Sequence, residues 1–279
     1  MTCQARRLVT LAGVEHSFAR AQQVLHEMCG WQVDDEVIRQ TTHAEARRAA
    51  HERPARTDAE AFAEASGEVE VLMDAGKVNT RDGWRDVKMG VFLKRNDGSP
   101  STPDAWDQRA LPAPTIRTTI AAIEDSDRFG ERLRTEADRL RVTTLPTLTV
   151  LGDGAEWIWN LAEEHLPQAS GVLDVFHALE HIGDAVKAVW GDDSDASRTR
   201  IESGRAALLS EGKGGVDRWL ASLFADMPTD AATDPLISLS AYLAKHPTRL
   251  GYAERLLIEL SAHRDLPGRW KEFSAIEFA

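Results

Sequence analysis

The spacing of apolar residues changes twice along the chain, and this change constrains the fold more than any other feature. Between residues 69 and 175, apolar and polar residues alternate in several short segments, which is typical of β-strands. On both sides of this region, apolar residues recur every three or four positions, which is typical of amphipathic helices. The order predicts an α/β fold with a mixed sheet, preceded by a helical segment and followed by an all-helical region.

Five segments of the central region have the composition of strands. The first ends at Asp74 and the fourth ends at Gly152-Asp153-Gly154, while Arg81-Asp82-Gly83 supplies a turn between the first two. The predicted strands cover residues 69–74, 87–94, 116–123, 148–151 and 172–175. Helices are predicted over 127–141, 156–164, from near His177, and later over 197–209, 216–224, 235–243 and 249–260.

The N-terminal segment has two predicted helices. One covers residues 14–30, with Gly30 as its C-cap, and the other runs from Asp34 or Asp35 to about His51. Their short connection is compatible with a helix-turn-helix, and an ordinary α-hairpin is at least as compatible. The predicted regions are therefore 1–66, helical; 67–190, the α/β core; and 191–279, helical.

Composition narrows the class of protein and raises one difficulty. No apolar run approaches the length of a membrane helix, the N-terminus lacks a signal-peptide pattern, and two cysteines without CxxC spacing predict neither a disulfide framework nor a zinc site. We therefore expect a cytoplasmic protein without a membrane partner. The net charge of −12 opposes binding to phosphate backbones. This charge leaves three interpretations: the protein has no nucleic-acid partner, it has a local basic patch, or a basic segment lies outside this chain.

Asp74 and Asp153 are the main candidates for chemistry. Each closes a predicted strand beside glycine, where an ion or a ligand can approach the backbone closely. Mg²⁺ prefers carboxylate oxygens, and a pair of such ions about 4 Å apart stabilises the attacking and leaving oxygens in phosphodiester chemistry. The structural alternative is that each aspartate only caps the turn or helix that follows it.

A second group of candidates follows the fifth predicted strand. Asp174, His177 and His181 lie in the segment DVFHALEH, with the two histidines on one helical face. A pair of histidines at this spacing can bind zinc, but HExxH is absent and no third ligand is evident, so supporting or core histidines are favoured. Trp157 and Trp159 could stack on a base, but their spacing beside an apolar sheet is more typical of core residues.

Several segments together resemble a known family. They are VEVLMDAGKVNTRDGWRDVKMGVFLK at 69–94, TVLGDGAEWIWNLAEE at 149–164, VLDVFHALEHI at 172–182 and RLGYAERL at 249–256. The chain resembles the Kra-type transposases of bacterial insertion sequences, which are related to the Mutator-like DDE transposases. The resemblance covers about residues 7–256. It implies an RNase H-like core with metal-binding acids at Asp74 and Asp153, and an Asp-x-x-His signature at Asp174 and His177.

The chain departs from the family pattern at the third acid. The family carries this acid in a Gly-Ser-Gly-x-Val-Glu motif followed by a basic tail, and residues 257–279 match neither. Glu254, Glu259, Glu272 and Glu277 are available carboxylates without that context, and Glu254 is the first candidate. We expect a copy truncated at both ends, with cleavage activity lost or impaired, and no carboxylate beyond residue 245 within metal-bridging distance of the first two.

The resemblance implies Mg²⁺ (or Mn²⁺) as cofactor, DNA at insertion-sequence ends and at the target as partner, and compatibility with a homo-oligomer. The expected reaction is DNA cleavage and strand transfer by a DDE-type transposase. Two alternatives remain: a non-catalytic regulator that binds DNA or a full-length transposase, and another metal-dependent nuclease on the same fold.

Overall fold

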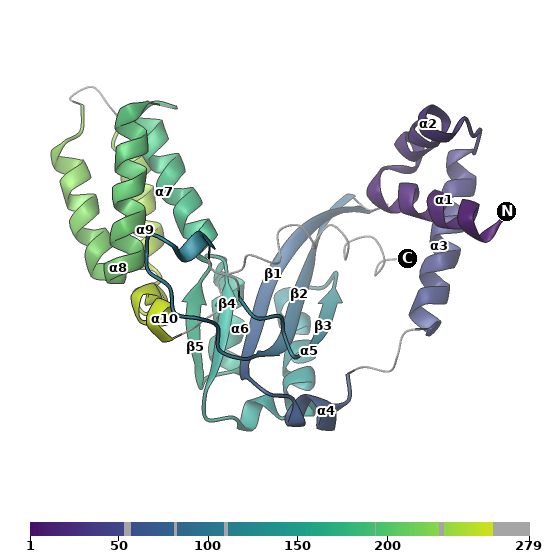
Figure 1. The fold of residues 1–279 in the computed structure, drawn as a ribbon, viewed down its shortest axis with the longest axis horizontal. Coiled ribbons are helices and arrows are strands. Elements are labelled where there is room, and N and C mark those ends of the chain that lie inside the picture. Colours follow the sequence, from purple (N-terminus) through teal and green to yellow (C-terminus); the bar gives the residue numbers. More distant parts are fainter. Residues whose placement is uncertain (53–56, 81–82, 109–110, 193, 229–231, 259–279) are drawn as a thin grey trace. The chain divides into compact units, whose positions relative to one another are not determined.

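A computed structural model describes residues 1–258 except 53–56, 81–82, 109–110, 193 and 229–231, and it leaves out the side chains of 50–52, 107, 254, 257 and 258 (Figure 1). Contacts divide the chain into two compact units. Among the described residues, one unit contains those from Met1 to Glu52, and the other contains those from Thr57 to Ile258. Each unit is described by itself.

The N-terminal unit contains three helices: α1 (Cys3–Glu15), α2 (Phe18–Cys29) and α3 (Asp35–Glu52). They share a small apolar core of Val9, Ala12, Ala21, Leu25 and Ile38. The predicted helix over 14–30 is wrong at its start, because Ser17 accepts the N–H of Arg20 and begins a new helix there. Gly30 is the C-cap, with a φ of 67°.

The second unit is built on a five-stranded mixed sheet in the order β3-β2-β1-β4-β5. The first three strands are antiparallel, whereas β1, β4 and β5 run parallel. All five predicted strands are present, so the predicted mixed α/β fold is confirmed. Their bounds are β1 Glu68–Thr80, β2 Gly83–Arg95, β3 Ile116–Ala122, β4 Leu148–Gly152 and β5 Ala169–Leu173.

Helices α5 (Ser126–Arg139) and α6 (Glu156–His165) pack on one face of the sheet (Figure 1). Two glycines show how closely: a Cβ atom at Gly90 would lie 3.4 Å from Leu133 of α5, and one at Gly152 would lie 2.7 Å from Ile158 of α6. Shorter elements lie before and between the strands, namely α4 (Ala59–Glu64), η1 (Trp106–Gln108) and η2 (Val142–Thr144).

The last helices are α7 (Val175–Trp190), α8 (Asp195–Ala225), α9 (Asp234–Ala244) and α10 (Tyr252–Ile258). The two helices predicted over 197–209 and 216–224 are both present within the range of α8, and they are antiparallel: the indole N–H of Trp219 donates to Oγ of Ser203 at 3.1 Å. The chain reverses at Gly212, which has a φ of 56°, and a Cβ atom there would lie 2.6 Å from the carbonyl oxygen of Leu250. Among the described residues, no helix combines the length and the apolar character that crossing a membrane requires.

Candidate functional site

Asp74 and Asp153 lie next to each other on neighbouring parallel strands. Met73 of β1 is paired with Gly152 of β4, so the residue that follows each of them is an aspartate. Because adjacent strands are about 4.8 Å apart, the two carboxylates share one small region of the sheet. The prediction that the strands carrying them are neighbours in one mixed sheet is confirmed.

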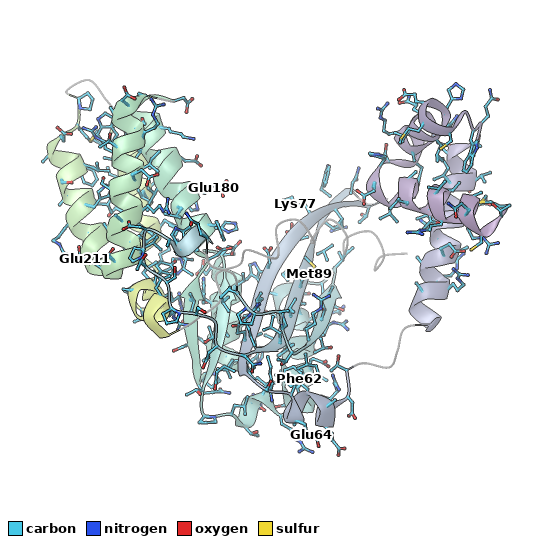
Figure 2. The ribbon with its side chains drawn as sticks, viewed as in Figure 1. Phe62, Glu64, Lys77, Met89, Glu180 and Glu211 are labelled. Atoms are coloured by element: carbon cyan, nitrogen blue, oxygen red, sulfur yellow. The ribbon has the colours of Figure 1, made fainter. Side chains whose placement is uncertain are left out.

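The prediction that the first strand ends at Asp74 is wrong. β1 continues to Thr80 and pairs with β2 as far as Gly83, whereas its pairing with β4 stops at Met73. Asp74 therefore lies where β1 leaves the parallel part of the sheet and continues as a two-stranded hairpin. Figure 2 labels Lys77 on this hairpin, three residues beyond Asp74.

Each of the two carboxylates is oriented by the main chain. Oδ1 of Asp74 accepts the N–H of Ala75 at 2.7 Å, and Oδ1 of Asp153 accepts the N–H of Ala155 at 2.8 Å. Within the described part of the chain, no hydrogen bond reaches the second oxygen of either group. Burial raises the pKa of the Asp74 carboxyl above its usual value, and the charge of Asp153 raises this pKa further. A bound cation would offset this repulsion.

The loop that carries Asp153 is held from two sides. The indole N–H of Trp159 donates to the carbonyl oxygen of Asp153 at 2.9 Å, and this tryptophan is buried, as its spacing predicts. On the other side, a Cβ atom at Gly154 would overlap Cε2 of Tyr242. Glycine is therefore required here for the phenol ring to approach the loop.

Asp174 and His177 form an ion pair beside the two acids. The N–H of Asp174 donates to the carbonyl oxygen of Gly152 at 2.8 Å. Its Oδ1 caps α7 by accepting the N–H of Phe176 at 2.8 Å, and its Oδ2 lies 3.2 Å from Nδ1 of His177. The Asp174 carboxylate raises the pKa of His177 to about 9, and the charges of Asp153 and Asp74 also raise it. His177 is therefore a cation at neutral pH.

The other predicted site residues are His181 and the glutamates beyond residue 245. His181 lies one turn beyond His177 on α7, and its ring centroid is 4.0 Å from that of Tyr242. Glu254 lies in α10, but its side chain is outside the described residues, as are Glu259, Glu272 and Glu277. Whether a carboxylate beyond residue 245 approaches the first two therefore stays a prediction.

Two residues near the site were not predicted from the sequence. Burial raises the pKa of the Tyr242 hydroxyl, and the charges of Asp153 and Asp174 raise it further. Burial, together with the charges of Arg249 and Lys245, lowers the pKa of His246 to about 4. The signal available in the sequence was their spacing of four residues at the end of an apolar helix.

The donor set is that of a two-carboxylate site. Across the described ranges, no three His, Cys, Asp or Glu side chains come close enough together to hold a metal ion. Asp74 and Asp153 nevertheless fit Mg²⁺, because this ion keeps several waters and is commonly held by one or two carboxylates together with substrate phosphates. A zinc site at His177 and His181 is not favoured, since Asp174 and Tyr242 are their respective neighbours.

Searches with the whole sequence against protein-family models and against curated proteins find no match.

Proposed function

We propose that the chain is a member of the DDE-type transposase lineage, with an RNase H-like core whose Asp74 and Asp153 bind Mg²⁺ and a DNA phosphodiester. The observation that carries this proposal is the register of Met73 with Gly152 in a sheet of order β3-β2-β1-β4-β5. It gives two adjacent carboxylates on parallel strands, each with one oxygen fixed by the main chain.

The residues of the chain have distinct roles in this proposal. Asp74 and Asp153 hold Mg²⁺, which supplies Lewis-acid stabilisation of charge on phosphate oxygens when it is bound. His177, held by Asp174, is a cation whose charge interacts with both acids, and it attracts a phosphate to this edge of the sheet. Trp159 keeps the Asp153 loop in position through its hydrogen bond, and Tyr242 packs against the same loop at Gly154.

We expect this chain to bind Mg²⁺ and DNA but to cleave DNA weakly or not at all. Two carboxylates hold one ion less firmly than three, and Glu254 is the first candidate for a third ligand. DNA cleavage by the wild type would contradict this expectation. If Glu254→Gln then abolished the cleavage, Glu254 would be identified as the third ligand. DNA binding without Mg²⁺ binding would favour the regulator alternative.

Magnesium calorimetry tests the proposal directly. Asp74→Asn and Asp153→Asn each remove one of two charged ligands, so we expect Mg²⁺ affinity to fall at least about tenfold in either variant. Asp192→Asn, which changes an exposed acid between α7 and α8, is the matched control and is expected to titrate like the wild type. Equal Mg²⁺ affinity in all four proteins would refute the site.

The hairpin beyond Asp74 offers a basic contact despite the acidic net charge. Asp74 pairs with Met89 and Val78 pairs with Arg85, so the two-residue period of a strand puts exposed Arg85 on the same face as Asp74. Asp74 and Val78 are four positions apart, which is about 13 Å along the strand. A DNA strand at Asp74 would therefore pass Arg85.

We expect Arg85→Ala to weaken binding to duplex DNA several-fold and to reduce the slope of log affinity against log salt by about one. Fluorescence anisotropy at several salt concentrations measures both quantities. Arg134→Ala is the control, because Arg134 lies on α5 and is paired with Asp138. An unchanged salt slope in Arg85→Ala would exclude Arg85 from the DNA contact.

A further inference from the structure

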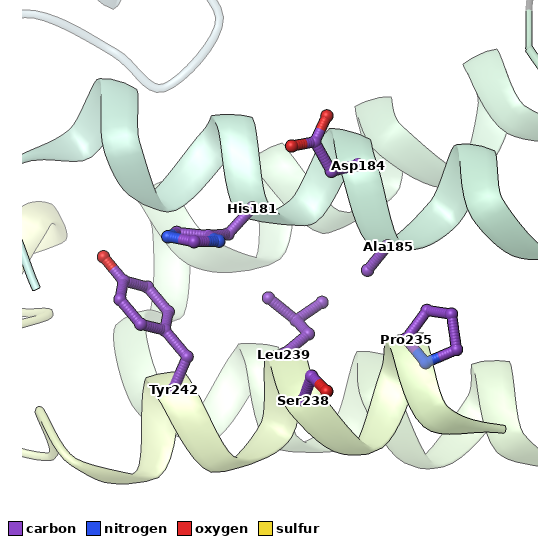
Figure 3. Close-up of a pocket in the computed structure, with 7 residues that line it drawn as sticks. All are labelled: His181, Asp184, Ala185, Pro235, Ser238, Leu239 and Tyr242. Carbon is purple, nitrogen blue, oxygen red and sulfur yellow. The ribbon is translucent and has the colours of Figure 1, made fainter.

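The connection between α9 and α10 contacts both parts of the chain that carry the site. Near the end of α9, the Tyr242 ring lies beside His181 of α7, with 4.0 Å between the ring centroids, and it packs against Gly154 (Figure 3). The chain then leads to Arg249, the first residue of the RLGYAERL segment. The main chain and the side chain of Arg249 have separate contacts, and each leads to one of the aspartates.

The main chain of this connection binds the outer edge of β5. The carbonyl oxygen of Arg249 accepts the N–H of Leu173 at 3.0 Å. The hydroxyl of Tyr252, a buried residue, donates to the carbonyl oxygen of Leu173 at 2.8 Å. Leu173 is the last residue of β5 and directly precedes Asp174. The connection therefore holds the strand end that leads to Asp174.

The side chain of Arg249 packs on Trp159, whose indole N–H donates to the carbonyl oxygen of Asp153. Cζ of Arg249 lies 4.1 Å from the centroid of the indole, and the side chain is only 16% exposed. Nη2 lies 2.9 Å from Oε1 of Glu163, and Nη1 lies 3.1 Å from Nδ1 of His246. A guanidinium held over an indole is attracted to the ring, and more strongly where water is excluded.

Gly171 shows how closely these side chains pack on β5. A Cβ atom there would lie 3.0 Å from Cζ3 of Trp159 and 3.2 Å from Cγ of Arg249. Both side chains therefore lie directly on the backbone of the strand, which leaves the indole little room to turn. Without Arg249, one face of the indole would lose its packing contact, and the hydrogen bond to Asp153 would break more often.

We infer that Arg249 is a positioning residue for the metal ligand Asp153: it holds Trp159, and Trp159 holds the main chain of Asp153. The inference rests on the proposed function, because that function makes Asp153 a ligand of Mg²⁺. Mg²⁺ requires nearly ideal octahedral geometry, so a ligand that moves binds it more weakly. Arg249 contributes to metal affinity through this geometry, without touching the ion.

Hydrogen exchange of the Trp159 indole proton, followed by NMR, measures this role without any metal. Trp159→Phe identifies the resonance, and the indole proton of Trp219, bonded to Oγ of Ser203, is the internal reference. We expect Arg249→Met to accelerate exchange at Trp159 about tenfold relative to Trp219, because a stacked and mostly buried guanidinium is lost. Unchanged exchange at Trp159, or equal acceleration at both indoles, would refute the inference.

Arg200→Met is the matched control, because Arg200 is also stacked on an indole, that of Trp190 at 4.5 Å, and is also paired with an acid, Asp226. In Mg²⁺ calorimetry we expect Arg249→Met to bind at least about threefold more weakly than the wild type, and Arg200→Met to bind like it. Equal losses of affinity in both variants would contradict the inference. Arg249→Lys keeps the charge but not the planar stack, and this milder variant should show the same selective acceleration at the Trp159 indole.

The outcomes separate this inference from the proposed function. Normal Mg²⁺ binding by the wild type, without selective acceleration at Trp159 in Arg249→Met, would refute the role of Arg249 and leave the metal site standing. Selective acceleration at Trp159, in a protein whose wild type does not bind Mg²⁺, would support the hold of Arg249 on the Asp153 loop and refute the metal site.

Discussion

Lowering the pH from 6.5 to 4 is expected to destabilise the wild type more than the His246→Asn variant. His246 is only 2% exposed, and its environment lowers its pKa from 6.5 to about 4. One pKa unit corresponds to about 1.4 kcal/mol, so the shift is equivalent to about 3 kcal/mol of unfolding free energy by pH 4.

The direction follows from proton binding in the two states. Between pH 4 and 6.5 the histidine of the unfolded chain binds a proton, whereas buried His246 in the folded chain does not. The unfolded state therefore binds more protons in this window, and the free energy of unfolding rises with pH. The contribution is fully present above pH 6.5 and is lost as pH falls towards 4.

Asparagine is chosen because it keeps one contact and removes the titration. Nη1 of Arg249 lies 3.1 Å from Nδ1 of His246, and Oδ1 of asparagine can accept the same hydrogen bond. Arg249 also retains its ion pair with Glu163 at 2.9 Å. The direct cost of the substitution is therefore measured at pH 8, where the histidine is neutral in both states.

Urea titrations at pH 8, 6, 5 and 4.5 provide the measurement, with tryptophan fluorescence as the signal because most tryptophans lie between residues 57 and 258. We expect the difference in unfolding free energy between wild type and His246→Asn to move in favour of the variant as pH falls. A difference that stays constant from pH 8 to 4.5 would show that His246 titrates normally.

The sheet was predictable because its strands alternate with period two and end at glycine or charged residues. Val69, Val71 and Met73 of β1 face the α5–α6 layer, and this pattern is local. The continuation of β1 to Thr80 was not predictable, because residues 75–80 are mostly exposed and lack the alternation. The close approach of Gly212 to the carbonyl oxygen of Leu250 was not predictable either, because the two residues are distant in sequence.

Some residues of the candidate site were also predictable from the sequence, and others were not. Asp74 and Asp153 were found because each follows an apolar strand, and parallel pairing then brings them together. The role of Asp174 as a helix cap and ion-pair partner follows from the four consecutive residues 174–177. Tyr242 and His246 were missed, since only packing of α9 against the Asp153 loop gives them their environment.

The second large effect is expected at Glu70, which lies on the strand of Asp74. Its Oε2 is 3.5 Å from Nε of Arg95, and the two side chains are only 3% and 10% exposed. Removing one member of a buried ion pair leaves the other charge in a poorly solvated place. We expect Glu70→Leu to reduce the free energy of unfolding by about 3–5 kcal/mol.

The double variant Glu70→Leu/Arg95→Met distinguishes the cost of an isolated charge from the net value of the pair. Replacing both partners by apolar residues removes the isolated charge, so the double variant should be more stable than Glu70→Leu alone. Recovery should be incomplete, because Arg95 also donates to the carbonyl oxygen of Pro112 in the segment before β3.

Urea titrations of the wild type, both single variants and the double variant complete the cycle. Glu70 and Asp74 lie on the same face of β1, four residues apart, so Mg²⁺ calorimetry on the same proteins shows whether the strand keeps its position. We expect the folded double variant to bind Mg²⁺ like the wild type, since Asp74 is held by the N–H of Ala75 and by pairing with β2. Additive costs in the two single variants, without recovery in the double variant, would mean that the pair contributes no coupling and that each side chain is held by other neighbours.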